Sequence, residues 1–466
     1  ARDRQFLMMT ESTVIRERSH RAGAGFLKSR RFAFFELGCA LFVAAVWYLS
    51  DGRAGAWPLL VAGVPWALRL AKGKPPVKPT RFDRLQGAFL ITAIIGAWAA
   101  YDPAVAWGKF WLLAGAVVLF YALAGQPQDN VWPIVAGLGL FGSAVAAYFW
   151  LTHDWAALPA KIEAIQSLGL RWAALRPELP GGLHALHPNV AGGIMAMFFP
   201  FIVATAIREA RRGRVAVAAA FAAAGLLLLA GLAATTSRGA WLALLAGLGL
   251  WVVWAVTGRL SGKLFLSRRK TLALCLAVVV SVGLFIAAAS PGGLVGLLDR
   301  LPGPANAGSR LELGRDAVDL IGDFPLTGGG LGSFDGLYSH YIRVIPHHYL
   351  IHSHNLFLNV ALEQGIIALL LMSAMAAAAL WWLADPIHSY PRHAFPDRSL
   401  LCGALFAVLA VMGIHGLVDD PLYGSRGALL LWLPLAFTAV IFPRHRSRRR
   451  ESPADRRVTW VGMFLV

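Results

Sequence analysis

Four histidines stand close together before a long apolar run, and histidine is the side chain best suited to proton chemistry near neutral pH. They are His347, His348, His352 and His354, and the apolar run begins after Asn355. A neutral imidazole can ligate zinc, or it can accept a proton from a reacting hydroxyl group as a general base. The cluster can also consist of ordinary polar residues at the mouth of a buried helix.

A zinc site needs about four ligands, and acidic ligands are scarce near the histidines. His348 and His352 have the i, i+4 spacing that places two side chains on one face of a helix. Neither is followed by the glutamate of the HExxH zinc motif, and the nearest acidic residues are Asp335 and Glu363. We therefore expect no metal and no other cofactor. We interpret Glu363 as a buried, hydrogen-bonded residue that supports the architecture of the site.

The composition of the chain is that of a membrane protein. It is 57% hydrophobic and only 15% charged, and its mean hydropathy is +0.59. Apolar runs of about 17 residues or more can cross a hydrocarbon core of roughly 30 Å. The first run lacks the small-residue cleavage site of a signal peptide, so we interpret it as a retained span. The sequence predicts an all-α polytopic membrane protein with about twelve transmembrane helices. The runs cover residues 32–50, 54–70, 85–101, 103–124, 131–152, 187–207, 215–235, 240–257, 271–289, 355–383, 399–418 and 426–442.

Basic residues predict the orientation of these spans, because Lys and Arg collect on the cytoplasmic side. With the N-terminus in the cytoplasm and twelve alternating spans, 32 of the 43 Lys and Arg residues fall on that side. Both termini are then cytoplasmic. The net charge of +18 reflects topology and contact with lipid headgroups rather than nucleic-acid binding. The expected organisation is a basic segment at 1–31, a single transmembrane domain at 32–442 and a basic tail at 443–466.

Two extracytoplasmic segments are long, 153–186 and 290–353, and the second lies between the ninth and tenth spans. This larger loop begins rich in Gly and Pro and changes at Ser309, a candidate N-cap that would form a capping box with Glu312. Apolar residues then recur at helical spacing until Pro325 and a run of three glycines end the helix. We therefore predict a helix inside this loop.

Arg310 is the most informative position of that helix. At 100° per residue it falls on the apolar face with Leu313 and Ala317, while the acidic residues occupy the opposite face. As the first helical residue it would stand where free N–H groups favour an anion. Arg310 either holds a negatively charged ligand or pairs with an acidic side chain or carbonyl groups in the core. Arg315 lies on the acidic face, where a solvated ion pair contributes under about 1 kcal/mol.

Two further polar residues stand at the outward ends of spans. Arg238 lies in "TTSRGAW" (235–241), a tight turn between two spans with no acidic residue near it in sequence. It either marks an anion site or extends to the lipid headgroups. Asn189 follows Pro188 in "LHPNVAGG", and it either caps the helix that starts there or contacts a ligand.

Together these segments resemble the O-antigen ligase/polymerase superfamily of bacterial membrane proteins. The matching pieces are "TTSRGAW" (235–241), "SRLELGRDAVDLIGDFPLTGGGLGSF" (309–334) and "HSHNLFLNVALEQG" (352–365), with "HPN" (187–189) as a weaker fourth. The resemblance covers about residues 187–385. The order, spacing and common outward orientation of the pieces carry it, since no single motif is decisive.

The resemblance implies a GT-C-like fold and a metal-independent glycosyltransferase on the periplasmic face of the bacterial inner membrane, surrounded by membrane lipids. The implied donor is a glycan on undecaprenyl pyrophosphate. Arg238 and Arg310 match the family's arginines that hold the pyrophosphate, and His354 matches the histidine that activates the acceptor hydroxyl. Because this chain has extra histidines, His352 could share or take over that role. Possible supporting residues are Asn189, Arg315, Asn355 and Glu363.

Our hypothesis from the sequence is an O-antigen ligase that transfers the polymer to a lipid A–core sugar and inverts the anomeric carbon. Two rivals share the machinery: an O-antigen polymerase and an O-oligosaccharyltransferase that glycosylates protein. A transporter or lipid flippase is the alternative from another class, and it predicts ionisable residues gathered at mid-membrane. The ionisable residues within the spans are too scattered for that reading, and the polar clusters lie on one side.

Overall fold

The computed structural model describes residues 29–176, 185–263, 267–289, 307–344, 350, 352–385 and 397–444. This part of the chain contains helices and no strands. His347 and His348 lie outside the described residues, as do most of the two terminal segments. Eight helices are long and apolar enough to cross a membrane, so the chain is an all-α, multi-pass membrane protein. They are α2 (Arg30–Ser50), α5 (Pro103–Ala124), α6 (Gln128–Thr152), α8 (Pro188–Arg211), α9 (Val215–Ala234), α10 (Arg238–Lys263), α15 (Leu356–Ala384) and α16 (Arg398–Gly416).

The four remaining apolar runs also form helices. These are α3 (Leu59–Ala71), α4 (Asp83–Trp98), α11 (Arg268–Ala289) and α17 (Leu433–Ile441), the last preceded by a short 3₁₀ helix at Arg426–Leu430. Helices α3, α4 and α17 have fewer than the roughly 20 residues that a straight span needs. Every predicted run is therefore helical, while the count of twelve spans stays a prediction.

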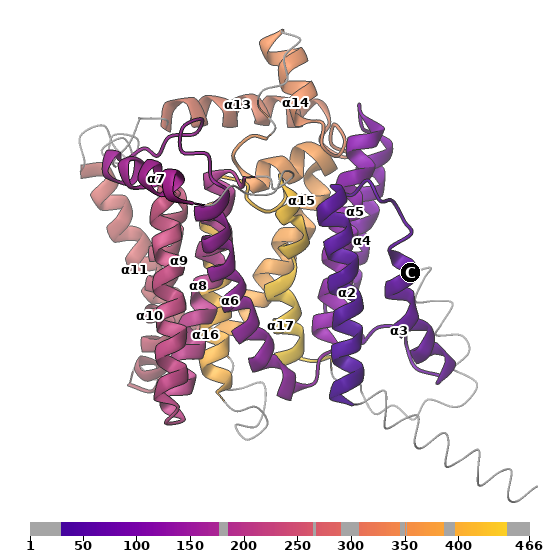
Figure 1. Cartoon of the computed structure of the whole chain (residues 1–466). Coiled ribbons are helices and arrows are strands. Elements are labelled where there is room, and N and C mark those ends of the chain that lie inside the picture. The colour runs from indigo at the N-terminus through magenta and orange to yellow at the C-terminus, as the bar shows by residue number, and fades with distance from the viewer. Residues whose placement is uncertain are drawn as a thin grey trace, which may run out of the picture.

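The long helices stand side by side in one bundle, and helices α7 (Glu163–Leu175) and α13 (Ala307–Asp323) lie across its upper end (Figure 1). Among the eight candidate spans, helix α8 is the most enclosed, because α6, α9, α10 and α16 all pack against it. Small residues allow these close contacts: a Cβ atom on Gly193 of α8 would come within 2.8 Å of the His415 ring on α16. The bundle thus brings the ends of α8, α10 and α16 together below α13.

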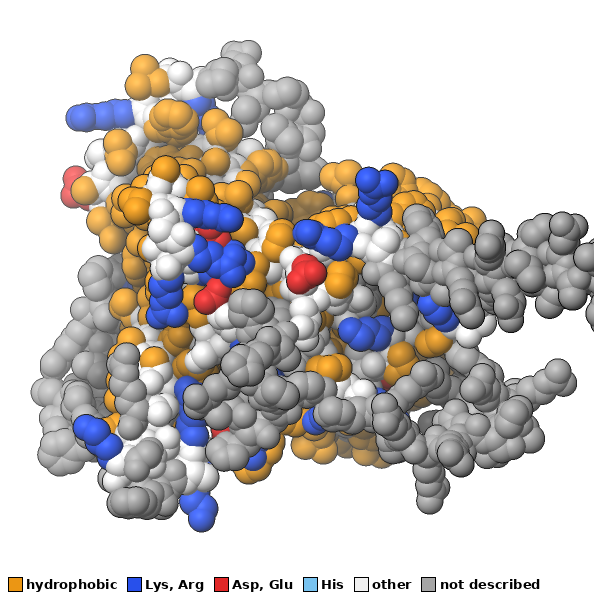
Figure 2. Space-filling view, turned by 90° about the horizontal axis from the view of Figure 1, so that it is seen from below, with side chains coloured by type: hydrophobic (Ala, Val, Ile, Leu, Met, Phe, Trp, Pro, Cys, Tyr) orange, Lys and Arg blue, Asp and Glu red, His pale blue; other side chains and the backbone are white. Residues whose placement is uncertain are grey.

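The lower end of the bundle is rich in basic residues. Lys and Arg gather on that face in the view from below (Figure 2), and they flank the lower ends of α3, α4, α8, α10 and α11. This is the distribution expected if the lower end faces the cytoplasm and the α13 end faces outward. The orientation itself stays a prediction.

Helix α13 confirms the predicted amphipathic face and corrects its start. Leu313 and Ala317 are buried against α15, while Glu312 and Arg315 are exposed. The helix already includes Ala307, so the prediction of Ser309 as N-cap is wrong, and Arg310 is not the first helical residue. The capping signal at Ser309 does not set the start of the helix, because packing of the apolar face, rather than a capping preference, supplies most of a helix's stability.

Helix α15 is interrupted at Gly365, where φ is 82° and ψ is 170°. The segment that follows α13 packs against this break. The amide of Ile366 donates to the carbonyl of Pro325 over 2.8 Å, and the amide of Gly329 donates to the carbonyl of Leu362 over 2.7 Å. A Cβ atom at Gly365 would lie 2.1 Å from the Leu326 carbonyl oxygen, so only glycine fits. The three-glycine run therefore ends one helix and fixes the direction of the first turns of another.

Candidate active site

The histidine segment forms a tight turn at the start of α15. Asn355 is the N-cap of that helix, because its Oδ1 atom accepts hydrogen bonds from the amides of Phe357 and Leu358, each over 3.0 Å. Its Nδ2 atom donates to the carbonyl of Leu417 over 3.1 Å. Asn355 thus supports the site by joining the helix start to the loop that follows α16.

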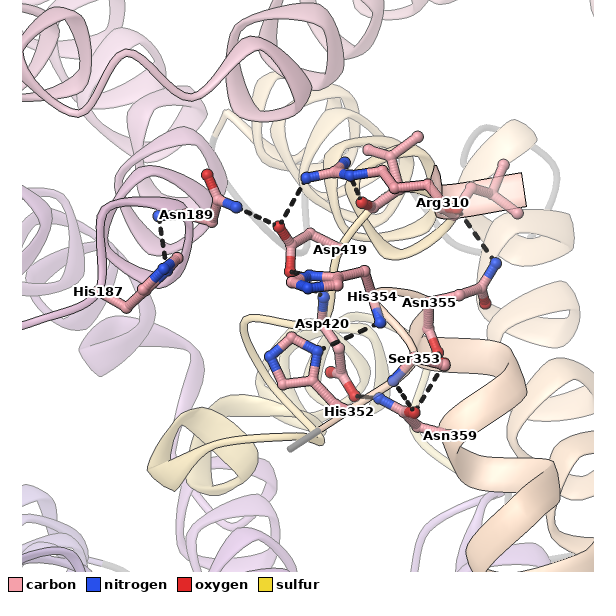
Figure 3. Close-up of polar contacts among 12 residues, drawn as sticks. His187, Asn189, Arg310, His352, Ser353, His354, Asn355, Asn359, Asp419 and Asp420 are labelled. Atoms are coloured by element: carbon pink, nitrogen blue, oxygen red, sulfur yellow. Dashed lines mark hydrogen bonds and ion pairs between the residues drawn. The ribbon is translucent and has the colours of Figure 1, made fainter. Parts of the chain in front are cut away.

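His354 adopts a left-handed backbone conformation with φ of 54°. This conformation is uncommon outside glycine and costs of the order of 1 kcal/mol, so neighbouring contacts must hold it. The amide of His354 donates to Nδ1 of His352 over 3.2 Å. The amide and hydroxyl of Ser353 both donate to Oδ1 of Asn359, over 2.9 and 2.7 Å. The turn is therefore fixed on both sides, and it directs the His354 ring toward the loop after α16 (Figure 3).

Asp419, in the loop after α16, is the centre of the polar contacts in Figure 3. Its Oδ1 atom lies 3.2 Å from Nδ1 of His354. Its Oδ2 atom accepts a 2.6 Å hydrogen bond from Nδ2 of Asn189 and lies 3.5 Å from a guanidinium nitrogen of Arg310. Segments that are 65 to 230 residues apart in sequence meet at this one carboxylate.

Asp419 is buried but remains ionised. Burial alone would raise the pKa of its carboxyl group, but the hydrogen bond from His354 and the positive charges of His354 and Arg310 hold that pKa well below its ordinary value. An ionised carboxylate can only accept hydrogen bonds, so Nδ1 of His354 carries the hydrogen. The other ring nitrogen, Nε2, is then the basic one.

The sequence reasoning missed Asp419. The signal that could have found it is the acidic pair in "VDDP" (418–421), which stands at the outward end of an apolar run. The second member, Asp420, is fully buried, and its Oδ2 atom accepts a 2.6 Å hydrogen bond from Asn359. Asn359 also binds Ser353, so Asp420 ties the loop after α16 to the histidine turn.

His352 is placed less favourably for proton transfer than His354. Its Nδ1 atom is already the acceptor for the amide of His354, and the two rings meet edge to face with centroids 4.5 Å apart. Burial, together with the positive charge of His354, lowers the pKa of His352 to about 4. The ring is therefore neutral at pH 7 and acts as a support for the turn.

Arg310 was expected either to hold a negatively charged ligand or to pair with an acidic side chain or carbonyl groups, and its position is compatible with both. It pairs with Asp419 and donates to the carbonyl of Val418, and it also borders a cavity.

Asn189 does not cap α8, because the ring of His187 accepts a hydrogen bond from the amide of Asn189 and therefore occupies the N-cap position. The amide side chain of Asn189 is thereby free to bind Asp419.

The cavity has a volume of about 410 Å³ and lies between α8, α13 and the loops beside them. His354, Arg310 and Asn189 form part of its wall. Arg238 is not a lining residue; it is the first residue of α10, directly after a turn whose Thr235 and Thr236 do line the cavity. The other lining residues are His153, Leu158, Pro159, Ala160, Lys161, His187, Pro188, Ala234, Glu312, Leu313, Tyr338, Arg343 and Leu350.

Two predicted supporting residues lie away from the cavity. Arg315 is exposed on the outer face of α13. Glu363 is buried in α15, as the sequence indicated, and its carboxylate pairs with Lys109 of α5 at 2.6 and 2.8 Å. The ammonium group of Lys109 also lies 4.0 Å from the centroid of the Tyr423 ring. Glu363 therefore joins α5 to α15, and any role in a reaction stays a prediction.

His352, His354 and Asp419 also have the composition of a metal site, since their ligand atoms lie within 4.8 Å of one another. However, Nδ1 of His352 is occupied by an amide, and both oxygens of Asp419 are engaged by neighbouring side chains. The guanidinium group of Arg310 beside Asp419 would also repel a cation. These contacts suit a hydrogen-bonded base better than a zinc site, and metal independence stays a prediction.

Comparison with known proteins gives one family. Residues 223–373 match the family described as O-antigen ligase, and a search of curated proteins found no match. The matched range contains Arg238, Arg310 and His354, whereas Asn189 and Asp419 lie outside it. The family implies a glycosyltransferase-like enzyme of the O-antigen ligase and polymerase group. Over residues 223–373, about a third of its length, the chain is therefore similar to the O-antigen ligase family.

Proposed function

We propose that the protein is a lipopolysaccharide O-antigen ligase, which moves a glycan from undecaprenyl pyrophosphate to a lipid A–core sugar. The observation that carries the proposal is the pairing of His354 with Asp419 in the wall of a cavity that Arg310 also lines. Glycosyl transfer from a pyrophosphate leaving group is helped by a base that deprotonates the acceptor and by a cation that stabilises the departing pyrophosphate, and both line this cavity.

The reaction follows from the arrangement of hydrogen-bond donors and acceptors. Nε2 of His354 accepts the proton of the acceptor hydroxyl, and that oxygen attacks the anomeric carbon of the donor glycan. The bond between the anomeric carbon and the pyrophosphate oxygen breaks, and its electron pair leaves with the pyrophosphate. Asp419 holds the His354 ring in orientation and stabilises the imidazolium that forms. Direct displacement inverts the configuration of the anomeric carbon.

The leaving group gains negative charge as this bond breaks, so positive groups must already be in place. Arginine suits this task, because its planar guanidinium group can meet two phosphate oxygens at once. We assign this role to Arg310 in the cavity wall and to Arg238 behind the turn at residues 235–237. His352 is the support of His354 rather than a second base, since its Nδ1 atom is occupied.

The position of the site in the bundle also supports an expected side of the membrane for the active site and helps to compare the alternative functions. The residues lie at the α13 end, opposite the basic lower face, which supports a periplasmic active site in the inner membrane. An O-antigen polymerase and a protein O-oligosaccharyltransferase use the same donor and differ in the acceptor. Transport is less well supported, because the candidate groups gather at one end of the bundle and not at mid-membrane.

Reconstitution of the purified protein with a carrier-linked glycan and separate acceptors tests the proposal. We expect transfer to lipid A–core and no requirement for another carrier-linked glycan. Elongation of carrier-linked glycan alone would identify a polymerase, and transfer to a protein acceptor alone would identify an oligosaccharyltransferase. Transmembrane movement of the lipid-linked glycan without any transfer would favour a flippase.

A further inference from the structure

Lys161 stands on an ordered loop between α6 and α7. Its amide donates to the hydroxyl of Thr236 over 3.2 Å, which ties the loop to the turn before Arg238. The preceding amide, of Ala160, donates to the side chain of Gln166 over 2.7 Å, and the same side chain donates to the carbonyl of Trp155 over 2.7 Å. These bonds hold the backbone of Lys161 in place before any ligand arrives.

The side chain of Lys161 lines the same cavity as Arg310 and His354. Lys161 is exposed as a whole residue, but partial burial lowers the pKa of its ammonium group; the positive charges of Arg238 and Arg310 lower that pKa further, while Asp419 acts in the opposite direction. Lys161 therefore lies within electrostatic reach of both arginines. Within the described part of the chain, no carboxylate forms an ion pair with it.

The other cations of the cavity are already engaged. Arg310 shares its charge with Asp419 at 3.5 Å, and Arg343 donates to the hydroxyl of Tyr338 over 3.0 Å. Like charges held close together in a half-enclosed space are unfavourable unless a ligand brings the opposite charge. The positive charge of Lys161, unlike that of Arg310, is thus left without an ion-pair partner among the described residues.

We propose that the ammonium group of Lys161 is a third cation for the diphosphate of the lipid-linked donor, in addition to Arg238 and Arg310. This inference rests on the function proposed above and adds a binding residue to it. Release of a polyprenyl diphosphate exposes roughly one further negative charge on the phosphate that carried the sugar. An ammonium group on a fixed loop can meet this charge as a point contact, whereas Arg310 remains tied to Asp419.

The first test measures binding without turnover. Full-length protein in nanodiscs is titrated with farnesyl diphosphate and with farnesyl monophosphate. We expect wild-type protein to prefer the diphosphate, Lys161→Ala to bind the diphosphate about tenfold more weakly, and Lys161→Arg to retain most of the affinity. Arg171→Ala is the matched control, because Arg171 is an exposed cation on α7 outside the cavity. It should bind both probes like the wild type.

The second test measures transfer kinetics with the carrier-linked donor. Lys161→Ala should raise the KM for the donor and lower kcat, and leave the KM for the acceptor unchanged. If Lys161→Ala binds farnesyl diphosphate as tightly as wild type does, the role of Lys161 is refuted and the proposed function stands. If wild-type protein does not distinguish diphosphate from monophosphate, the pyrophosphate site itself is wrong, and Lys161 falls with it.

Discussion

Nδ1 of His354 lies 3.2 Å from Oδ1 of Asp419, so a residue just before one apolar helix and a residue just after another form a single proton-handling pair. The same carboxylate is bound by Asn189 and faces Arg310. The orientation of the base and the position of the cation are therefore set by one buried group. Substitution of Asp419 should therefore affect both the base and the cation, whereas substitution of His354 or Arg310 should affect only one of them.

Asp419→Asn should lower kcat by about 10²–10⁴-fold, because the amide can donate to Nδ1 of His354 and move the ring hydrogen to Nε2. Transfer assays with saturating donor and acceptor measure this loss. Asp319→Asn, an exposed acidic position on α13, is the control and should keep wild-type activity. Wild-type kcat in Asp419→Asn would contradict the orienting role.

The two histidines of the turn should respond differently. His354→Ala should remove transfer, since the base is lost, whereas His352→Asn should retain most of it because the new side chain can still accept the amide of His354. Turnover of both variants, with their thermal unfolding as a check of folding, separates the two roles. An inactive, folded His352→Asn together with an active His354→Ala would reverse the assignment.

Arg310 and Arg315 form a matched pair on one helix. Arg310→Ala should abolish transfer and Arg310→Lys should restore only a part, because lysine lacks the planar fork. Arg315→Ala, on the exposed face, should change activity by less than about fivefold, since a solvated ion pair contributes under about 1 kcal/mol. Donor saturation curves for the three variants provide the measurement. Equal losses at both positions would point to an effect on α13 as a whole.

Metal removal is a direct test of the hydrogen-bonded site. Because Nδ1 of His352 and both oxygens of Asp419 are already engaged, prolonged treatment with a strong chelator should leave transfer unchanged. Activity is compared before treatment, after treatment and after addition of zinc. Loss of activity that zinc restores would assign His352, His354 and Asp419 to a metal centre instead.

Acid should weaken the fold partly through His352. Burial and the charge of His354 lower its pKa to about 4, compared with about 6.5 in an unfolded chain. Between these values the unfolded state binds a proton that the native state does not, so the free energy of unfolding falls as the pH drops through this window. The full effect is about 3 kcal/mol. Between pH 7 and pH 4.5 the unfolding temperature of the wild type should fall further than that of His352→Asn, and equal falls would exclude this cause.

The sequence predicted the helical elements well because apolar runs of membrane length leave few alternatives to a helix. The predicted runs at 103–124 and 215–235 match α5 and α9 within one residue. The start of α13 was predicted wrongly, since local capping signals at Ser309 do not report the packing of Leu313 and Ala317 against α15. The local sequence pattern predicts the ends of a helix less reliably than it predicts which residues of the helix are buried.

The candidate site was predictable only in part. His354 and Arg310 were identified from their types and positions, and the structure brings both to one cavity. Asp419 was missed because it is 65 residues from His354, and only the packing of α16 beside α8 and α15 brings the two together. Asn189 and Asp419 are 230 residues apart in the sequence, so no local sequence pattern indicates their contact either.

The interruption of α15 at Gly365 has a consequence for how the protein sits in bilayers of different thickness. The part of α15 after Gly365 has roughly 19 residues, or about 28 Å, which is enough by itself to cross the hydrocarbon core. The part before it is held by Gly329 and the loop after α16, while Pro325 binds Ile366 at the start of the second part. The depth of His354 is thus set by protein contacts, and lipid mismatch can be absorbed by tilting of the second part alone.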